Sequence, residues 1–298
     1  MKKILALLFI LFFASIGGSQ TRPYELEQDQ PRRIWAEAFT KKEKTAAAAK
    51  QPATTAAKRA KKREYKVATP QIIADAVAPE TVVGITVWRY RPAREGEIGI
   101  QIGNDRLVAE RVEGNTVLSK GEKVRLSIEA ARDGYLYVIN REQYADGTTG
   151  DPYLIYPTSR LTGGDNHTTV GRVFSIPAQA DQPPYFTLTP GRADQVAELI
   201  SVLVTPEPIT NVKISEQVTQ ISSAQVTEWE QKWGKSVGRM EMQGGAGEPI
   251  TAIEQEAGTG ARLLKHTDPA PQTLYYNPEV SAHDPVFVNV NLQYSERE

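Results

Sequence analysis

The chain of 298 residues has no cysteine and only three histidines. Without cysteine the protein forms no disulfide, offers no thiolate nucleophile or thiolate metal ligand, and carries no cysteine for lipid attachment. The histidines, His167, His266 and His283, are too far apart in the sequence for the close spacing of a helical metal-binding pair. We therefore expect no metal or other cofactor, and a fold that is held together by burial of its core.

Long apolar runs are also scarce, and the one that is present lies at the N-terminus. Ile4–Ala14 follows Lys2 and Lys3 and precedes a run of small residues, which is the order of a secretory signal peptide. A membrane-spanning helix needs about 20 apolar residues, and this run is shorter. We predict a signal peptide over residues 1–19 rather than a retained anchor. The protein is then exported, to the periplasm or the extracellular space, with no integral membrane segment.

Charge is distributed unevenly along the chain. Residues 41–66 hold ten Lys/Arg and two Glu, whereas residues 67–298 hold 20 basic and 30 acidic residues. We interpret residues 20–80 as a flexible, basic, Ala/Lys-rich arm that either stays solvated or attracts an anionic surface. The arm lacks the interleaved aromatic residues that stack on bases, so we expect no nucleic-acid partner.

After the arm the sequence pattern changes to short segments in which apolar and other residues alternate, and this alternation predicts β-strands. Val82–Trp88 alternates with period two, and Val124–Glu129 predicts a half-buried strand whose Arg125, Ser127 and Glu129 face water. Turn residues separate these segments at roughly ten-residue spacing, which favours a β-sandwich or barrel over a βαβ fold. Further strand-like runs are Tyr135–Asn140, Tyr153–Tyr156, Val170–Ile176, Tyr185–Leu188, Leu199–Val204 and Pro285–Tyr294.

The same pattern gives a domain organisation. We predict a mainly β, sandwich-like antiparallel domain over residues 81–210 and a C-terminal extension over 211–298 whose final strand returns to the main sheet. Within the extension we expect a short helix near 222–233 that docks through a tryptophan stripe, followed by a glycine-rich loop over 243–260.

A tight turn at one position is a further expectation. Glycine at the end of Val112-Glu113-Gly114 suits a hairpin, so we expect the segments Arg106–Glu110 and Asn115–Leu118 to pair with each other.

Several short motifs follow one another between Val82 and Pro208. They include Gly121-Glu122-Lys123-Val124, Asp133-Gly134-Tyr135-Leu136-Tyr137-Val138, Asp146-Gly147, Leu154-Ile155-Tyr156-Pro157, Phe174-Ser175-Ile176-Pro177 and Phe186-Thr187-Leu188. In this order and spacing the segment, which is under half of the chain, resembles the bacterial family known as domain of unknown function 4384 (DUF4384). The resemblance implies a secreted or envelope protein with an accessory or sensing role, and it implies no activity for the domain itself.

Tyrosines gather on two neighbouring expected strands and on the loop between them. A tyrosine on a sheet face offers flat apolar area and a hydroxyl, which suits recognition of a peptide or a sugar, although the same rings can cover the edge of a core. Two carboxylates of the loop can wrap calcium, but their spacing is not that of an EF-hand, and a plain Asp-Gly turn fits better. The candidate ligand-binding residues are Tyr135, Tyr137, Tyr144, Asp146, Asp151 and Tyr153.

One motif suggests catalysis. Gly234–Gly238 has the pattern G-x-S-x-G around Ser236, but a nucleophile elbow requires a strand before the serine and a helix after it, and the preceding residues are predicted to be helical. We therefore expect no enzyme but a non-catalytic envelope or periplasmic interaction module for a protein or glycan. The alternatives are a secreted serine hydrolase that uses Ser236 with His266 or His283, and a structural component of a secretion or surface assembly.

Overall fold

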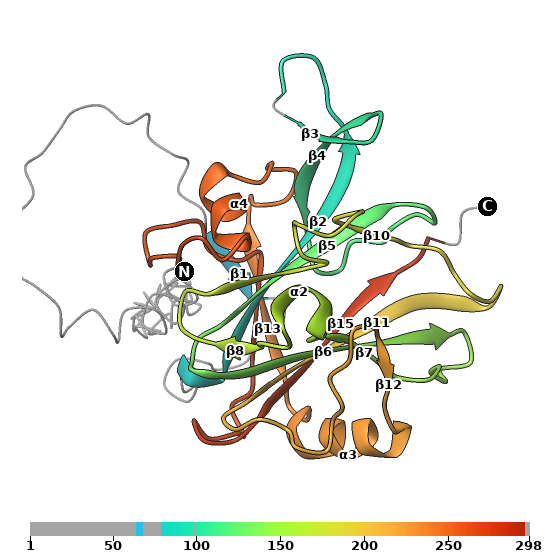
Figure 1. The fold of residues 1–298 in the computed structure, drawn as a ribbon, viewed down its shortest axis with the longest axis vertical. Coiled ribbons are helices and arrows are strands. Elements are labelled where there is room, and N and C mark those ends of the chain that lie inside the picture. Colours follow the sequence, from blue (N-terminus) through green and yellow to red (C-terminus); the bar gives the residue numbers. More distant parts are fainter. Residues whose placement is uncertain (1–63, 68–78, 98, 296–298) are drawn as a thin grey trace, which may run out of the picture.

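The computed structural model describes residues 64–67, 79–97 and 99–295. The expected signal peptide and most of the expected arm lie outside these ranges. The described residues form two antiparallel sheets that pack face to face (Figure 1), so the predicted mainly β, sandwich-like fold class is confirmed. No helix of the described part is long and apolar enough to cross a membrane.

The first sheet contains nine strands. They are β1 (Glu64–Val67), β2 (Val82–Pro92), β3 (Ile100–Ile102), β4 (Asp105–Val112), β5 (Lys123–Ala130), β9 (Val173–Ile176), β10 (Phe186–Thr187), β13 (Gly238–Gln243) and β14 (Thr273–Tyr276). One side of β2 pairs first with β14 and then with β4, and its other side pairs with β5. The sheet continues through β13 to β1, from β4 to β3, and from β5 to both β9 and β10.

The second sheet has the order β12-β7-β6-β11-β15, with β8 beside the start of β6. Its strands are β6 (Gly134–Tyr144), β7 (Tyr153–Tyr156), β8 (His167–Thr168), β11 (Gln195–Thr205), β12 (Thr219–Gln220) and β15 (Val286–Gln293). β11 pairs with β6 on one side and with β15 on the other, so the apolar run Leu199–Val204 is interior to the sheet. Short helical turns η2 (Pro79–Thr81) and α2 (Ser159–Thr162) precede β2 and follow β7.

The main core lies between the two sheets and follows from the period-two alternation. Alternate side chains of each strand point to this core, and each fully buried apolar side chain contributes about 1.5–3 kcal/mol. The buried core residues of the longest strands include Val83, Ile85, Val87, Leu126, Ile128, Leu136, Val138, Ile200, Val202, Val204, Val286, Val288 and Val290.

The expected C-terminal extension is built into both sheets. β14 pairs with Val82–Ile85 of β2, and β15 pairs with β11 along Ala197–Val204, so the last strand returns to the main sheet. Strands from before and after residue 210 therefore contribute to each sheet.

The predicted helix near 222–233 is confirmed as α3 (Ser223–Trp233), which covers the outer face of the second sheet (Figure 1). The Ser222 side chain accepts a hydrogen bond from the backbone N–H of Gln225 and caps the start of the helix. Val226 and Trp229 are buried against the sheet, so the tryptophan stripe docks the helix as predicted.

The outer face of the first sheet differs from the sequence expectation. Arg125, Ser127 and Glu129 of β5 were expected to face water, but all three are buried. The region that was expected to be a glycine-rich loop instead contains the helix α4 (Ala252–Gly258), and the Glu254 carboxylate of this helix interacts electrostatically with Glu129. Thr251 and Glu254 form a capping box that starts α4, and this signature outweighs the neighbouring glycines.

The expected hairpin at Val112–Gly114 is also wrong. β4 pairs instead with β3, across a two-residue loop at Gly103-Asn104 where Gly103 has a φ of 60°. A glycine in the first loop position supplies the positive φ that such a tight turn requires. After β4 the chain turns away, and Leu118 forms a bridge with Tyr294 at the end of the chain.

Candidate functional site

The six predicted site residues do not meet at one place. Tyr135 and Tyr144 lie near opposite ends of β6, and nine residue-to-residue steps along the strand place them about 30 Å apart. Tyr137 is buried beneath α3, where its hydroxyl accepts a hydrogen bond from the backbone N–H of Ile209 at 2.9 Å. Tyr135 is half-buried beside the same cluster, with His167 edge-on to its ring at 5.4 Å.

The exposed aromatic patch expected around Tyr144 and Tyr153 is not formed. Tyr144 is buried because Arg192, from the segment before β11, lies over its ring at 3.8 Å. The Tyr144 hydroxyl donates to Glu142 on its own strand. Tyr153 is 40% exposed, but the buried Tyr144 ring does not form an exposed surface with it. The tyrosines therefore pack locally and do not present one binding face.

The loop after β6 has the geometry of a turn. Asp146 accepts hydrogen bonds from the backbone N–H and the hydroxyl of Thr148 at 2.9 and 2.6 Å, and these bonds lower the pKa of Asp146. Gly147 has a φ of 83°, as a glycine in an Asp-Gly turn allows. Asp151 is exposed at the end of this loop. In the described part of the chain, no group of three or more His, Cys, Asp or Glu side chains could hold a metal ion.

Ser236 lies between α3 and β13, so a helix precedes it and a strand follows it. This order is the reverse of a nucleophile elbow. The residue has a φ of 60°, and its hydroxyl donates to Glu279 at 2.5 Å. The hydrogen-bond partner of the Ser236 hydroxyl is thus a carboxylate, whereas the hydrolase alternative places an imidazole base there.

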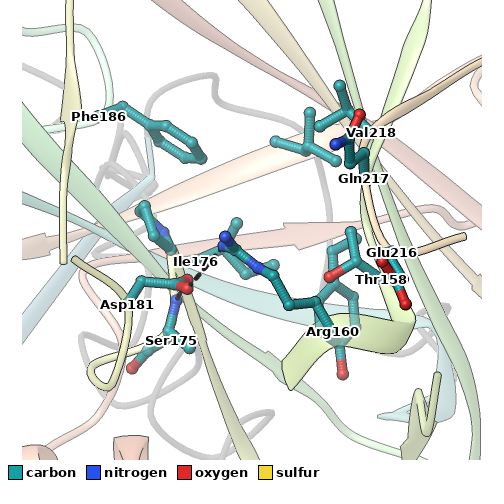
Figure 2. A pocket seen from close by; sticks show the side chains of 13 residues that line it. Thr158, Arg160, Ser175, Ile176, Asp181, Phe186, Glu216, Gln217 and Val218 are labelled. Carbon is teal, nitrogen blue, oxygen red and sulfur yellow. Dashed lines mark hydrogen bonds and ion pairs between the residues drawn. The ribbon is translucent and has the colours of Figure 1, made fainter. Parts of the chain in front are cut away.

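A cleft that the sequence analysis did not predict opens at one side of the sandwich. It lies between the edge strands β9 and β10 of the first sheet and β7 of the second, and its volume is about 380 Å³ (Figure 2). This volume falls at the lower end of the range for ligand pockets. The apolar lining residues are Ile155, Tyr156, Ile176, Pro177, Phe186 and Val218.

Two of the strands that line the cleft end at a proline. β7 ends at Tyr156 before Pro157, and β9 ends at Ile176 before Pro177. A proline has no backbone N–H to donate to a sheet, so the two ladders end there and the interior is left open at its edge. Ile155, Tyr156 and Phe186 also pack against the main core, which makes the cleft floor continuous with the interior.

Tyr156 is a fixed wall of the cleft. Its ring packs edge-on against Phe174 at 5.5 Å, and its hydroxyl donates to the backbone carbonyl of Asp165 at 3.0 Å. Burial raises the pKa of Tyr156, so the phenol stays neutral at physiological pH. The opposite side is more open, because Val218 is 56% exposed beside the short edge strand β12.

Charged side chains stand at the rim of the cleft. Arg160 of α2 donates to Asp181 at 3.1 Å, and the second Asp181 oxygen accepts from the backbone N–H of Ala178 at 2.9 Å (Figure 2). The Arg160 side chain is 67% exposed, and an exposed pair of this kind contributes little to stability. Arg160 can therefore leave Asp181 for a partner at small cost, while Glu216 keeps a carboxylate at the rim.

Comparison with protein-family models, with curated proteins and with solved structures finds no match to this chain. The sequence contained one signal of the cleft. The segments ending in Tyr156-Pro157 and Ile176-Pro177 both show a strand that stops at a proline, but only the fold brings the two ends together.

Proposed function

We propose that the protein is an exported, non-catalytic interaction module, and that its cleft binds an extended peptide segment of a protein partner. The apolar cleft at the open edge of the sandwich is the observation that supports this proposal. A cleft of about 380 Å³ has room for one or two apolar side chains of a peptide. The apolar, core-continuous floor favours such a side chain over a sugar, because a glycan needs polar partners for its hydroxyls.

The strands around the cleft also suit an extended partner. β10 and β12 each have two residues and lie at the margins of their sheets, next to Phe186 and Val218. Edge strands offer unpaired backbone groups, and peptide recognition commonly combines such groups with pockets for alternate side chains. Arg160 at the rim adds a charged group that can pair with a carboxylate of the peptide.

The proposal agrees with the resemblance to the DUF4384 family, which implies an accessory module. Leu154–Pro157, Phe174–Pro177 and Phe186–Leu188 carry that resemblance, and residues of all three segments line the cleft. A structural role in a secretion or surface assembly would use the same cleft for a neighbouring subunit, whereas no contact of Ser236 favours the hydrolase alternative.

The test is a random-peptide display selection on the purified full chain, followed by calorimetric titration of the selected peptide. Val218→Asp places a charge in the cleft, and Val117→Asp is the matched control, because the two valines are 56% and 52% exposed and only Val218 lines the cleft. We expect Val218→Asp to weaken binding at least about tenfold, since losing one buried apolar side chain costs about 1.5 kcal/mol or more. Equal binding by both variants would overturn the proposal.

A further inference from the structure

A second concave surface lies on the first sheet and shares no lining residue with the cleft of the proposed function. β2, β4 and β3 extend beyond the sandwich as a long projection (Figure 1). At the base of this projection a groove of about 740 Å³ runs between β2, β4 and the start of β5.

The groove is positively charged on an acidic body. Its lining contains six Lys/Arg and three Asp/Glu, whereas residues 67–298 as a whole hold 20 basic and 30 acidic residues. Such a local reversal of charge attracts anions into the concave surface. The basic lining residues are Arg89, Arg91, Arg94, Arg106, Lys120 and Lys123.

Carboxylates hold two of the guanidinium groups in place. The two oxygens of Glu110 accept from Arg89 and from Arg91, each at 2.6 Å, and Glu97 accepts from Arg91 at 2.6 and 2.8 Å. Burial on its own would raise the pKa of Glu110, but the hydrogen bonds from the two arginines outweigh it and the pKa is lowered. A fixed guanidinium loses less side-chain freedom when it binds an anion, so Arg89 is preorganised for one. All three Arg91 nitrogens already donate to Glu110 or Glu97, so Arg91 holds these carboxylates in place.

The other cations at the groove are held less firmly. The side chains of Arg94 and Lys120 are exposed and form no hydrogen bond or ion pair with the described residues. Lys123 donates to Asp105 at 3.2 Å and lies over the ring of Tyr185 at 5.0 Å, which fixes its position at one wall. The groove thus contains both cations that neighbouring side chains hold in place and exposed cations without a hydrogen bond or ion pair to the described residues.

We propose that this groove binds a phosphate group, either on a lipid headgroup or as a free polyphosphate anion. Forked guanidinium groups and ammonium groups together match the several oxygens of a phosphate, and a charge of about −2 is met by the excess of basic residues. The inference goes beyond the proposed peptide-binding function and does not depend on it.

The experiment uses the full chain and two probes. Calorimetry with inorganic pyrophosphate tests a free anion, and co-sedimentation with phosphatidylglycerol vesicles, against phosphatidylcholine vesicles, tests a headgroup. The variant is Arg94→Glu with Lys120→Glu, and the matched control is Lys213→Glu with Lys265→Glu, which makes the same charge change at exposed residues outside the groove. The basic arm is present in both variants, so it contributes equally to vesicle binding.

We expect the groove variant to bind the probes at least about tenfold more weakly than the control, with weaker binding of the wild type at high salt. Binding of both probes identifies the phosphate group as the ligand, and binding of vesicles alone identifies the headgroup. Equal binding of the probes by the two variants, or no binding of either probe by the wild type, would overturn the inference. Val218→Asp should leave phosphate binding unchanged, so failure of one site is distinguishable from failure of the other.

Discussion

The outer faces of the two sheets are both covered, but by different contacts. α3 covers the second sheet with apolar contacts, in which Val226 and Trp229 meet Phe287. On the first sheet, apolar contacts such as that of Ala257 of α4 with Val173 of β9 are joined by a buried ion pair between Glu254 of α4 and Arg111 of β4, and we call this the ionic cover. A polar strand face is therefore not always exposed to solvent. The alternation along a strand defines its two faces, but what packs on each face depends on the rest of the chain.

The two covers should also respond differently to perturbation. The apolar cover gains its stability from area removed from water, which depends little on pH or partners. Within the ionic cover, Arg111 donates to Glu254 and to the backbone carbonyl of Ala270 at 2.9 Å, and lies over the ring of Trp88 at 5.0 Å. Buried Glu129 lies in the same cluster, and one of its oxygens has no hydrogen-bond partner among the described residues.

The largest effect is expected from the apolar cover. Trp229→Ala removes a buried ring between α3 and the second sheet and should lower the free energy of unfolding by about 3–5 kcal/mol. Urea denaturation measures the loss. The control is Trp233→Ala, whose ring stacks on Trp229 at 6.4 Å and is only half-buried, so it should cost clearly less. Equal losses would contradict the docking role of Trp229.

The ionic cover should be sensitive to removal of one partner. Glu254→Ala leaves the Arg111 charge buried without its carboxylate and removes the capping box of α4, so we expect a loss of about 3 kcal/mol in the same denaturation experiment. Arg111→Met combined with Glu254→Met removes both charges and should cost less than Glu254→Ala alone. A double variant that is less stable than the single one would show that the pair itself is strongly stabilising.

The ionic cover should depend on pH and the apolar cover should not. Burial raises the pKa of Glu129 to about 8 from an ordinary value of 4.5, with Arg111 opposing the rise and Glu254 and Asp268 adding to it. Between these two values the folded protein keeps a proton that the unfolded chain releases, so stability falls as the pH rises. One such group changes the free energy of unfolding by at most about 1.4 kcal/mol between about pH 6 and pH 7.

Glu129→Gln tests this pH dependence, because the amide keeps the shape of the protonated acid and does not titrate. Urea denaturation at the two pH values should show a smaller fall in stability for the variant than for the wild type. The same fall in both proteins would assign the pH dependence to other groups.

The smallest change in stability is expected from two serine hydroxyls on paired strands. Ser127 of β5 is paired in register with Ser175 of β9, and both are buried. The indole N–H of Trp88 donates to Ser127 at 2.8 Å, whereas the Ser175 hydroxyl has no hydrogen-bond partner among the described residues. Ser127→Ala should therefore cost about 1 kcal/mol and Ser175→Ala close to nothing, as thermal unfolding can measure. The reverse order would contradict the hydrogen-bond assignment.

Local pattern predicted the strands well, because each depends on its own alternation and turns. Val82–Trp88 and Leu199–Val204 lie within β2 and β11, and Trp229 docks α3 as its helical spacing indicated. The burial of Glu129 could not be predicted in this way, since it lies beside Glu254 of α4, more than a hundred residues later in the sequence.

The candidate sites illustrate the same limit. Clustering of tyrosines in the sequence between Tyr135 and Tyr153 suggested a shared surface, but β6 spreads them along its length. The cleft and the groove each combine residues from several strands, and no single segment shows them. Tyr156-Pro157 and Ile176-Pro177 marked two strand ends correctly, while their proximity depends on the order of strands in two different sheets.

The positions of β14 and β15 constrain the order of folding. Each sheet includes a strand that comes late in the sequence, since β14 begins at Thr273 and β15 ends at Gln293. A chain that emerges N-terminus first therefore cannot complete the first sheet before β14 emerges, or the second before β15 emerges. Until then Val82–Ile85 of β2 and the β15-facing side of β11 are unpaired, hydrogen-bonding edges on which another strand can pair.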